Sequence, residues 1–244
     1  MTRIHHKPNH IRVVLDRPER RNTITDTLLA DLDRAVTEGE ATSDCRTLVI
    51  SAEGADFCAG MDLDASHADT DDAELPYWTL LRRLTTSDLV TVAMIDGTAT
   101  AGGVGLAAAC DVVLAGRRAT FRLTETLFGL IPAMALPFVA RRIGEQRAFT
   151  ATLLAETLDA RTAAETGLVD RLAPTAEEAL RPLLIDLRRV RPGTVAALKA
   201  YRAKLFPWQP DLGDVARQAF LERLAEPGVR QAMSDLKAAL AGSA

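Results

Sequence analysis

The stretch from Met94 to Gly129 constrains the fold most, because it combines a strand, a glycine-rich turn and the start of a helix. An apolar run ends at Ile95 and is followed by three closely spaced glycines, Gly102, Gly103 and Gly105. Glycines at a strand-to-helix turn let backbone N–H groups approach a ligand, and the N-terminus of a helix favours negative charge. The stretch therefore predicts a cradle of N–H groups for an anion.

One acidic residue, Glu125, follows this cradle and sits beside Leu127 and Phe128. A carboxyl group next to such a cradle can move a proton beside a developing negative charge. The apolar neighbours favour burial of Glu125, and a surface helix position is the alternative. The sequence thus predicts a site made of an N–H cradle and one glutamate.

Composition excludes several classes of protein. The 244 residues are 48% hydrophobic and 25% charged, as in folded soluble domains, and a net charge of −4 gives no reason to expect nucleic acid or an anionic membrane as partner. The three cysteines are widely spaced, and three of the four histidines crowd the N-terminus, so we expect neither a disulfide framework nor a metal site. No apolar run is long enough to span a bilayer, so we expect a cytoplasmic protein.

Hydrophobic periodicity predicts an α/β body. Strands are predicted at 11–16, 47–52, 90–95, near 112 and at 168–172. Helices are predicted at 75–84, 133–143, 146–154 and from Thr25 or Asp26 through Val36, with only helices after 175 and an acidic loop at 64–74. We expect a core over 1–190 and a helical oligomerisation region over 191–244, with a plain cap on the same core as the alternative.

A second glycine turn, ending at Gly60, follows the strand at 47–52. The two turns would face one cleft if both strands end at the same edge of a parallel sheet. Residues 103–108 also fit the dinucleotide pattern, but the preceding strand ends too early, so nucleotide binding is not expected. Asp62 and Asp111 are expected to stabilise loops, and Cys110 to lie in the core.

In this order and spacing, the motifs of the chain resemble those of the crotonase (enoyl-CoA hydratase/isomerase) superfamily over nearly its whole length. The matching motifs are Arg17-Pro18-Glu19, 57–63, Asp96-Gly97, 101–103, Cys110-Asp111, Glu125, 129–132 and 163–170. The resemblance implies a spiral of ββα turns with a helical C-terminal trimerisation region. It also implies a thioester oxyanion hole formed by the backbone N–H groups of Met61 and Gly102.

The chain departs from the hydratase pattern at Gly105, where hydratases carry the first of two glutamates. The second glutamate matches Glu125. A single glutamate is found in enoyl-CoA isomerases, but the chain looks more similar to the hydroxymethylglutaryl-ACP dehydratases of polyketide β-branching cassettes. That similarity lies in segments 22–28, 101–105, 125–130, 136–138 and 141–144.

The resemblance implies dehydration of a 3-hydroxy-3-methylglutaryl thioester to the 3-methylglutaconyl thioester, with Glu125 as the base. The leaving hydroxyl needs a proton, either from Glu125 or from a water in the room left by Gly105. The alternatives are a double-bond isomerase and a non-catalytic scaffold with the same fold.

The expected catalytic residues are Glu125, Met61 and Gly102. The expected substrate-binding residues are Thr23, Ala59, Gly60, Asp62, Arg82, Gly103 and Gly105. Arg82 or Arg83 would face the distal carboxylate, and the equal alternative is that both are solvated charges on a helix. We expect no cofactor beyond the phosphopantetheine of CoA or of an acyl carrier protein, whose acidic surface Arg82, Arg83, Arg141, Arg142 and Arg147 would attract. A homotrimer or hexamer is expected.

Overall fold

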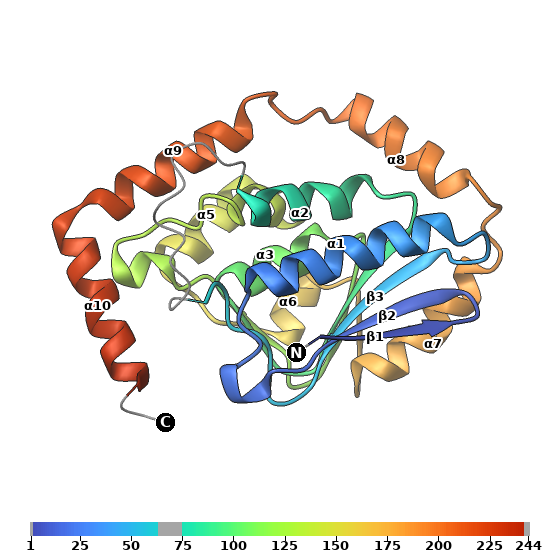
Figure 1. The fold of residues 1–244 in the computed structure, drawn as a ribbon, viewed down its shortest axis with the longest axis horizontal. Coiled ribbons are helices and arrows are strands. Elements are labelled where there is room, and N and C mark those ends of the chain that lie inside the picture. Colours follow the sequence, from blue (N-terminus) through green and yellow to red (C-terminus); the bar gives the residue numbers. More distant parts are fainter. Residues whose placement is uncertain (1, 63–74, 242–244) are drawn as a thin grey trace.

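The fold repeats one unit, in which a long strand, a short strand and a helix follow each other. The computed structural model describes residues 2–62 and 75–241 and contains three such turns (Figure 1). They are β3 (Thr47–Ala52), β4 (Asp56–Cys58) and α2 (Pro76–Thr86), then β5 (Val90–Ile95), β6 (Thr98–Thr100) and α3 (Gly102–Ala109), then β7 (Val112–Gly116), β8 (Thr120–Arg122) and the 3-10 turn η2 (Glu125–Phe128). This spiral of ββα turns is the predicted fold.

The long and short strands build two separate sheets. The six-stranded sheet has the order β1-β2-β3-β5-β7-β10, and the four-stranded sheet has the order β4-β6-β8-β9. Neighbours are parallel except for the pairs β1–β2 and β8–β9. The remaining strands are β1 (Thr2–Lys7), β2 (His10–Leu15), β9 (Leu158–Asp159) and β10 (Arg171–Ala173). Parallel pairing of β4 with β6 brings the loops that follow them to one edge.

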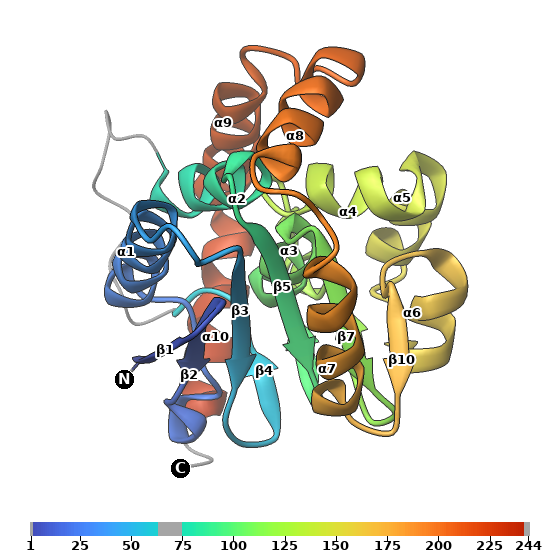
Figure 2. The same ribbon diagram turned by 90° about the vertical axis from the view of Figure 1, so that its right-hand side faces the viewer.

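Both faces of the large sheet are covered at its centre, so the strands β3, β5 and β7 are buried along nearly their whole length. Val90, Val92 and Met94 of β5 face α7 (Ala176–Leu187), which lies across the sheet in Figure 2. The alternate residues Ala93 and Ile95 belong to the cluster that contains α1 (Asp26–Ala41), α2 and α3. This second cluster is the larger one and supports the site described below.

Most predicted helices and strands are confirmed. Their bounds differ from the prediction where tertiary contacts determine where an element begins. Thr25 caps α1 by accepting a hydrogen bond from the Leu28 N–H. The last predicted strand begins later, at Arg171, because Leu168 and Val169 pack in the core. Strand β1 was not predicted, since its residues are mostly exposed and polar, and the expected loop after β3 contains β4. The acidic segment 64–74 lies outside the described residues.

The remaining helices flank the spiral: η1 (Pro18–Arg20), α4 (Leu136–Ile143), α5 (Glu145–Leu153), α6 (Ala160–Thr166), α8 (Thr194–Leu205), α9 (Leu212–Ala225) and α10 (Pro227–Ala241). In Figure 1, α8 and α9 form an arc above α2, and α10 turns down along one side. The predicted division at residue 190 falls between α7 and α8 and stays a prediction. Over residues 2–62 and 75–241, no helix combines the length and apolar character that a membrane span needs.

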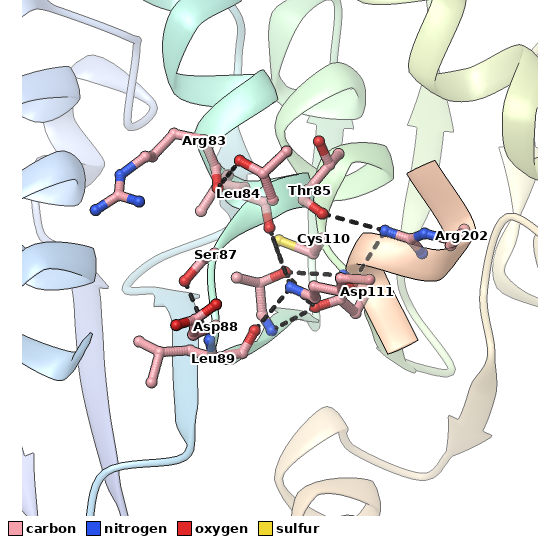
Figure 3. A network of polar contacts seen from close by, with 12 residues as sticks. Arg83, Leu84, Thr85, Ser87, Asp88, Leu89, Cys110, Asp111 and Arg202 are labelled. Atoms are coloured by element: carbon pink, nitrogen blue, oxygen red, sulfur yellow. Dashed lines mark hydrogen bonds and ion pairs between the residues drawn. The ribbon is translucent and has the colours of Figure 1, made fainter. Parts of the chain in front are cut away.

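A buried ion pair joins the tail to the spiral. The Nζ of Lys199 in α8 lies 2.5 Å from Oδ2 of Asp111, and it also donates to the carbonyl oxygen of Leu89 at 2.7 Å. Asp111 accepts hydrogen bonds from the N–H and hydroxyl of Thr91, and Arg202 reaches its other oxygen (Figure 3). Asp111 therefore stabilises a loop, as expected, and anchors α8 as well.

The substitution Asp111→Asn should destabilise the protein by about 3 kcal/mol, because it leaves the buried Lys199 charge unpaired. The control Asp186→Asn breaks the exposed pair with Arg171 and should cost under about 1 kcal/mol. Urea unfolding at one fixed protein concentration measures both free energies. Equal costs for the two variants would contradict the anchoring role.

Candidate active site

Two glycine turns meet at the start of α3. Gly60 follows β4 with φ +89°, and a Cβ placed on it would lie 2.8 Å from the Cβ of Ala101 and 3.2 Å from the N of Gly102. A Cβ on Gly103 would lie 2.2 Å from the carbonyl oxygen of Cys58. Only glycine fits at both positions, so the close approach of the two turns depends on them. The structure brings together the turns that the sequence placed at one sheet edge.

Backbone geometry leaves two N–H groups open at this junction. Gly102 is the first residue of α3, where the helix offers no acceptor for the N–H. On the other turn, Ile24 pairs with Gly60 and Asp62, through Ile24 N to Gly60 O at 2.8 Å and Asp62 N to Ile24 O at 2.9 Å. Because successive residues of an extended strand point to opposite sides, the Met61 N–H points away from Ile24. Within the described residues, neither N–H has a backbone acceptor.

The neighbouring predicted residues surround the Gly60 turn. The hydroxyl of Thr23 donates to Oδ2 of Asp62 at 3.3 Å, and the N–H of Ala59 donates to the carbonyl oxygen of Arg21 at 3.1 Å. Asn22 is buried and donates to the carbonyl oxygens of Glu53 and Asp56. This chain segment therefore fixes the path of the turn, and Asp62 has the loop-stabilising contacts that the sequence predicted.

Glu125 begins η2 rather than lying on an exposed helix. The residue as a whole is partly exposed, but its Oε2 is buried and has no hydrogen-bond partner. Burial raises the pKa of Glu125 to about 7, and the N–H groups of Glu125 and Thr124 offset part of this effect. A carboxyl group with this pKa is half ionised near neutral pH, where a general base works best.

The turn that carries Glu125 is clamped from two sides. The hydroxyl of Thr126 donates to the carbonyl oxygen of Thr152 in the last turn of α5 at 2.9 Å. On the other side, Nε of Arg223 in α9 donates to the carbonyl oxygen of Gly129 at 2.8 Å. Gly129 has φ +75°, and a Cβ there would lie 2.9 Å from Val229 of α10. The tail of the chain thus holds the loop of the candidate base.

Tyr77 is a site residue that the sequence reasoning missed. Its buried hydroxyl donates to the carbonyl oxygen of Gly102 at 2.5 Å. A Cβ on Gly105 would lie 2.3 Å from this hydroxyl and 2.7 Å from the Cβ of Ala135. The prediction that Gly105 leaves room for a water is therefore wrong, because Tyr77 and Ala135 fill this space. The missing second acid was the signal that should have prompted a search for another polar group.

Burial shifts the pKa values of the titratable groups near the glycine turns. The pKa of Tyr77 is raised well above its usual value of 10, mainly by burial and further by the charges of Cys58 and Glu125. Burial also raises the pKa of the Cys58 thiol to about 12. The pKa of Cys110 is likewise raised to about 12, and this thiol lies in the core as predicted. At neutral pH, Tyr77 is therefore a neutral hydroxyl.

Four of the five predicted arginines separate into two groups, and the fifth, Arg147, is exposed on α5. Arg82 and Arg141 line a cavity of about 850 Å³ and lie 4.7 and 4.1 Å from the ring centroid of Trp208. The described residues around this cavity include neither Glu125 nor the two glycine turns. Arg83 instead pairs with Glu40, and Arg142 holds Asp170 and the carbonyl oxygens at the end of α3. Arg83 and Arg142 are therefore structural residues.

Comparison with known proteins gives the family. Residues 7–206 match the family model described as enoyl-CoA hydratase/isomerase. Because this match covers most of the chain, and the ββα spiral agrees with it, the protein belongs to the enoyl-CoA hydratase/isomerase family, the crotonases. It is accordingly an enzyme of the enoyl-CoA hydratase/isomerase lyase type.

Individual members of the family show which proteins this chain is similar to. The chain is 33% identical over 199 residues to the bacillaene synthase dehydratase PksH of Bacillus subtilis, covering 79% of this chain and 76% of that protein. It is 34% identical over 215 residues to the enoyl-CoA hydratase ACTT6 of Alternaria alternata, covering 86% and 72%. The crystal structure of pksH, a polyketide biosynthesis enoyl-CoA hydratase from Bacillus subtilis, superposes with a TM-score of 0.89 at 28% identity, covering 95% and 94%.

The burial of Glu125 predicts a pH-dependent cost in stability. Its raised pKa means that the folded protein binds more protons than the unfolded chain between pH 4.5 and about 7, so stability falls as pH rises through this window. Glu125→Gln removes this cost. The free energy of unfolding of the variant should therefore exceed that of the wild type by on the order of 3 kcal/mol above pH 7 and equal it below pH 4.5.

Urea unfolding across this pH range measures the difference. Glu156→Gln, an exposed position, is the matched control and should show no such pH dependence. A Glu125→Gln variant that differs from the wild type by a constant amount at every pH would show that the carboxyl group is not buried in solution.

Proposed function

We propose that the protein dehydrates a 3-hydroxy-3-methylglutaryl thioester, carried on an acyl carrier protein, to the 3-methylglutaconyl thioester in polyketide β-branching. The observation that carries the proposal is one buried, unpartnered carboxyl group, Glu125, with a tyrosine hydroxyl instead of a second carboxylate beside Gly105. The similarity to the dehydratase PksH supports the reaction type.

In this proposal Glu125 takes the proton from the carbon beside the thioester carbonyl. The N–H groups of Met61 and Gly102 hold the oxygen of the resulting enolate, and each donor of this kind is worth roughly 3 kcal/mol. The N-terminus of α3 adds a favourable dipole at the same place. The enolate then expels the hydroxyl group from the next carbon.

Substrate contacts complete the proposal. Thr23, Ala59, Gly60, Asp62 and Gly103 lie on or beside the two glycine turns and would line the path of the thioester arm. Gly105 admits the Tyr77 hydroxyl. The assignment of Arg82 to the distal carboxylate stays a prediction. Its buried Nη1 has no hydrogen-bond partner, but the cavity that it lines includes neither Glu125 nor the two glycine turns.

The alternatives differ in the chemistry that they require. A double-bond isomerase uses one glutamate and no leaving group, and the site geometry is compatible with it. A non-catalytic scaffold has no need for a buried carboxyl group without a partner, which costs stability. The loss of water therefore distinguishes the proposal from both alternatives.

We also propose a homotrimer, or a dimer of trimers. Three apolar side chains on one face of α8, Leu198, Tyr201 and Leu205, are 64%, 58% and 51% exposed in the single chain. Val215 and Leu221 of α9 are also exposed. Apolar faces of this kind mark interfaces between proteins. Light scattering at micromolar concentration should give the mass of a trimer or hexamer, and a monomer mass would contradict this proposal.

The wild-type enzyme should convert hydroxymethylglutaryl thioester into a product lighter by one water, measured by mass spectrometry. Glu125→Gln should bind the thioester but lose at least ~10²-fold in rate, because an amide does not accept the proton. The exposed Glu156→Gln is again the control. Retained activity in the Glu125 variant would exclude Glu125 as the base.

Crotonyl-CoA tests whether the enzyme is a specialised dehydratase rather than a general enoyl-CoA hydratase. With one carboxylate, hydration of this simple substrate should be poor. Efficient hydration that depends on Glu125 would overturn the dehydratase assignment, while movement of a double bond in a 3-enoyl thioester without mass change would favour the isomerase.

A further inference from the structure

We propose that the hydroxyl of Tyr77 replaces the second carboxylate of the hydratases and protonates the hydroxyl group that leaves the substrate. This inference rests on the proposed dehydration and identifies the proton donor that a single glutamate leaves open.

The position of the hydroxyl is the first argument. It lies 2.3 Å from the point where a side chain at residue 105 would begin, which is where the resemblance places the hydratases' first glutamate. Tyr77 approaches from α2, is 4% exposed and donates to the carbonyl oxygen of Gly102. Gly102 is also the residue whose N–H is proposed to hold the enolate oxygen. The Tyr77 hydroxyl and the proposed oxyanion donor therefore lie at the same residue, since the hydroxyl contacts the carbonyl group of Gly102 and the donor is its N–H group.

The second argument is that the proton cycle closes with the groups present. The Glu125 carboxylate takes the proton from the carbon beside the thioester carbonyl, and the electrons of that bond form the enolate. The enolate then re-forms the carbonyl, and its electrons form the new carbon–carbon double bond. The bond from the third carbon to oxygen breaks, and the departing oxygen takes the Tyr77 proton to become water. The protonated Glu125 then returns its proton to the tyrosinate, so both groups are restored without another reactant.

The order of proton affinities supports each transfer. Hydroxide binds a proton far more tightly than a tyrosinate, since the pKa of water is about 15.7. The tyrosinate in turn binds a proton more tightly than the Glu125 carboxylate, whose pKa is about 7. The charge of Glu125 also raises the pKa of Tyr77, so the return of the proton restores the favoured state of both groups. Rotation about the bond to the ring redirects the hydroxyl from Gly102 to the substrate.

The test separates proton abstraction from loss of the hydroxyl group. In D₂O, 3-methylglutaryl thioester, which has no leaving hydroxyl, reports abstraction alone through deuterium incorporation beside the carbonyl. With the Tyr77→Phe variant, the rate of deuterium incorporation into this substrate should stay within about threefold of the wild-type rate. The rate of dehydration of the hydroxylated substrate should fall at least ~10²-fold. Glu156→Gln, an exposed position outside the site and the proposed subunit interface, should leave both reactions unchanged.

The possible results have distinct meanings. Dehydration that survives Tyr77→Phe would overturn the donor role and leave the proposed function intact. An equal fall in exchange and dehydration would also overturn it, because Tyr77 would then only support the glycine turn. Deuterium exchange by the wild type without any loss of water would overturn the proposed function and the donor role together.

Discussion

The site depends on the close packing of two backbone turns that have no side chains between them. The carbonyl oxygen of Cys58 occupies the space where a Cβ of Gly103 would project, and Ala101 and the N of Gly102 leave no room for one at Gly60. This contact joins the first ββα turn to the second. It brings the turns that carry the Met61 and Gly102 N–H groups together, and among the described residues neither group has a backbone acceptor. Donors fixed in this way are the ones proposed to hold the developing negative charge without reorganisation.

A second constraint is the desolvation of Glu125. The protein keeps this carboxyl group buried and unpaired, and the clamp formed by Thr126 and by Arg223 on Gly129 holds its turn in place. The Arg223 contact comes from the helical tail, which Lys199 also ties to the spiral through Asp111. The tail therefore supports the candidate base in addition to presenting the apolar face of α8.

The sequence predicted what local pattern and motif spacing encode. Buried strands such as β5, the Thr25 cap and the two glycine turns follow from apolar runs and glycine positions. Strand β1 could not be recognised, because an exposed polar strand lacks the alternation that marks a half-buried one. Tyr77 lies in the predicted helix 75–84 but was given no role, since its role depends on the absence of a side chain at Gly105, far away in sequence. Likewise, the ion pair that occupies Arg83 depends on a long-range contact.

A single glutamate, Glu125, desolvated beside the N–H pair, is the base that we propose acts near neutral pH. Direct titration of the carboxyl groups tests it: ¹³C NMR of protein labelled at the glutamate carboxyl carbons, with Glu125→Gln to assign the signal. The account predicts that the Glu125 resonance titrates with a pKa of about 7. A midpoint near 4.5, the ordinary value for glutamate, would show a solvated carboxylate and contradict the account.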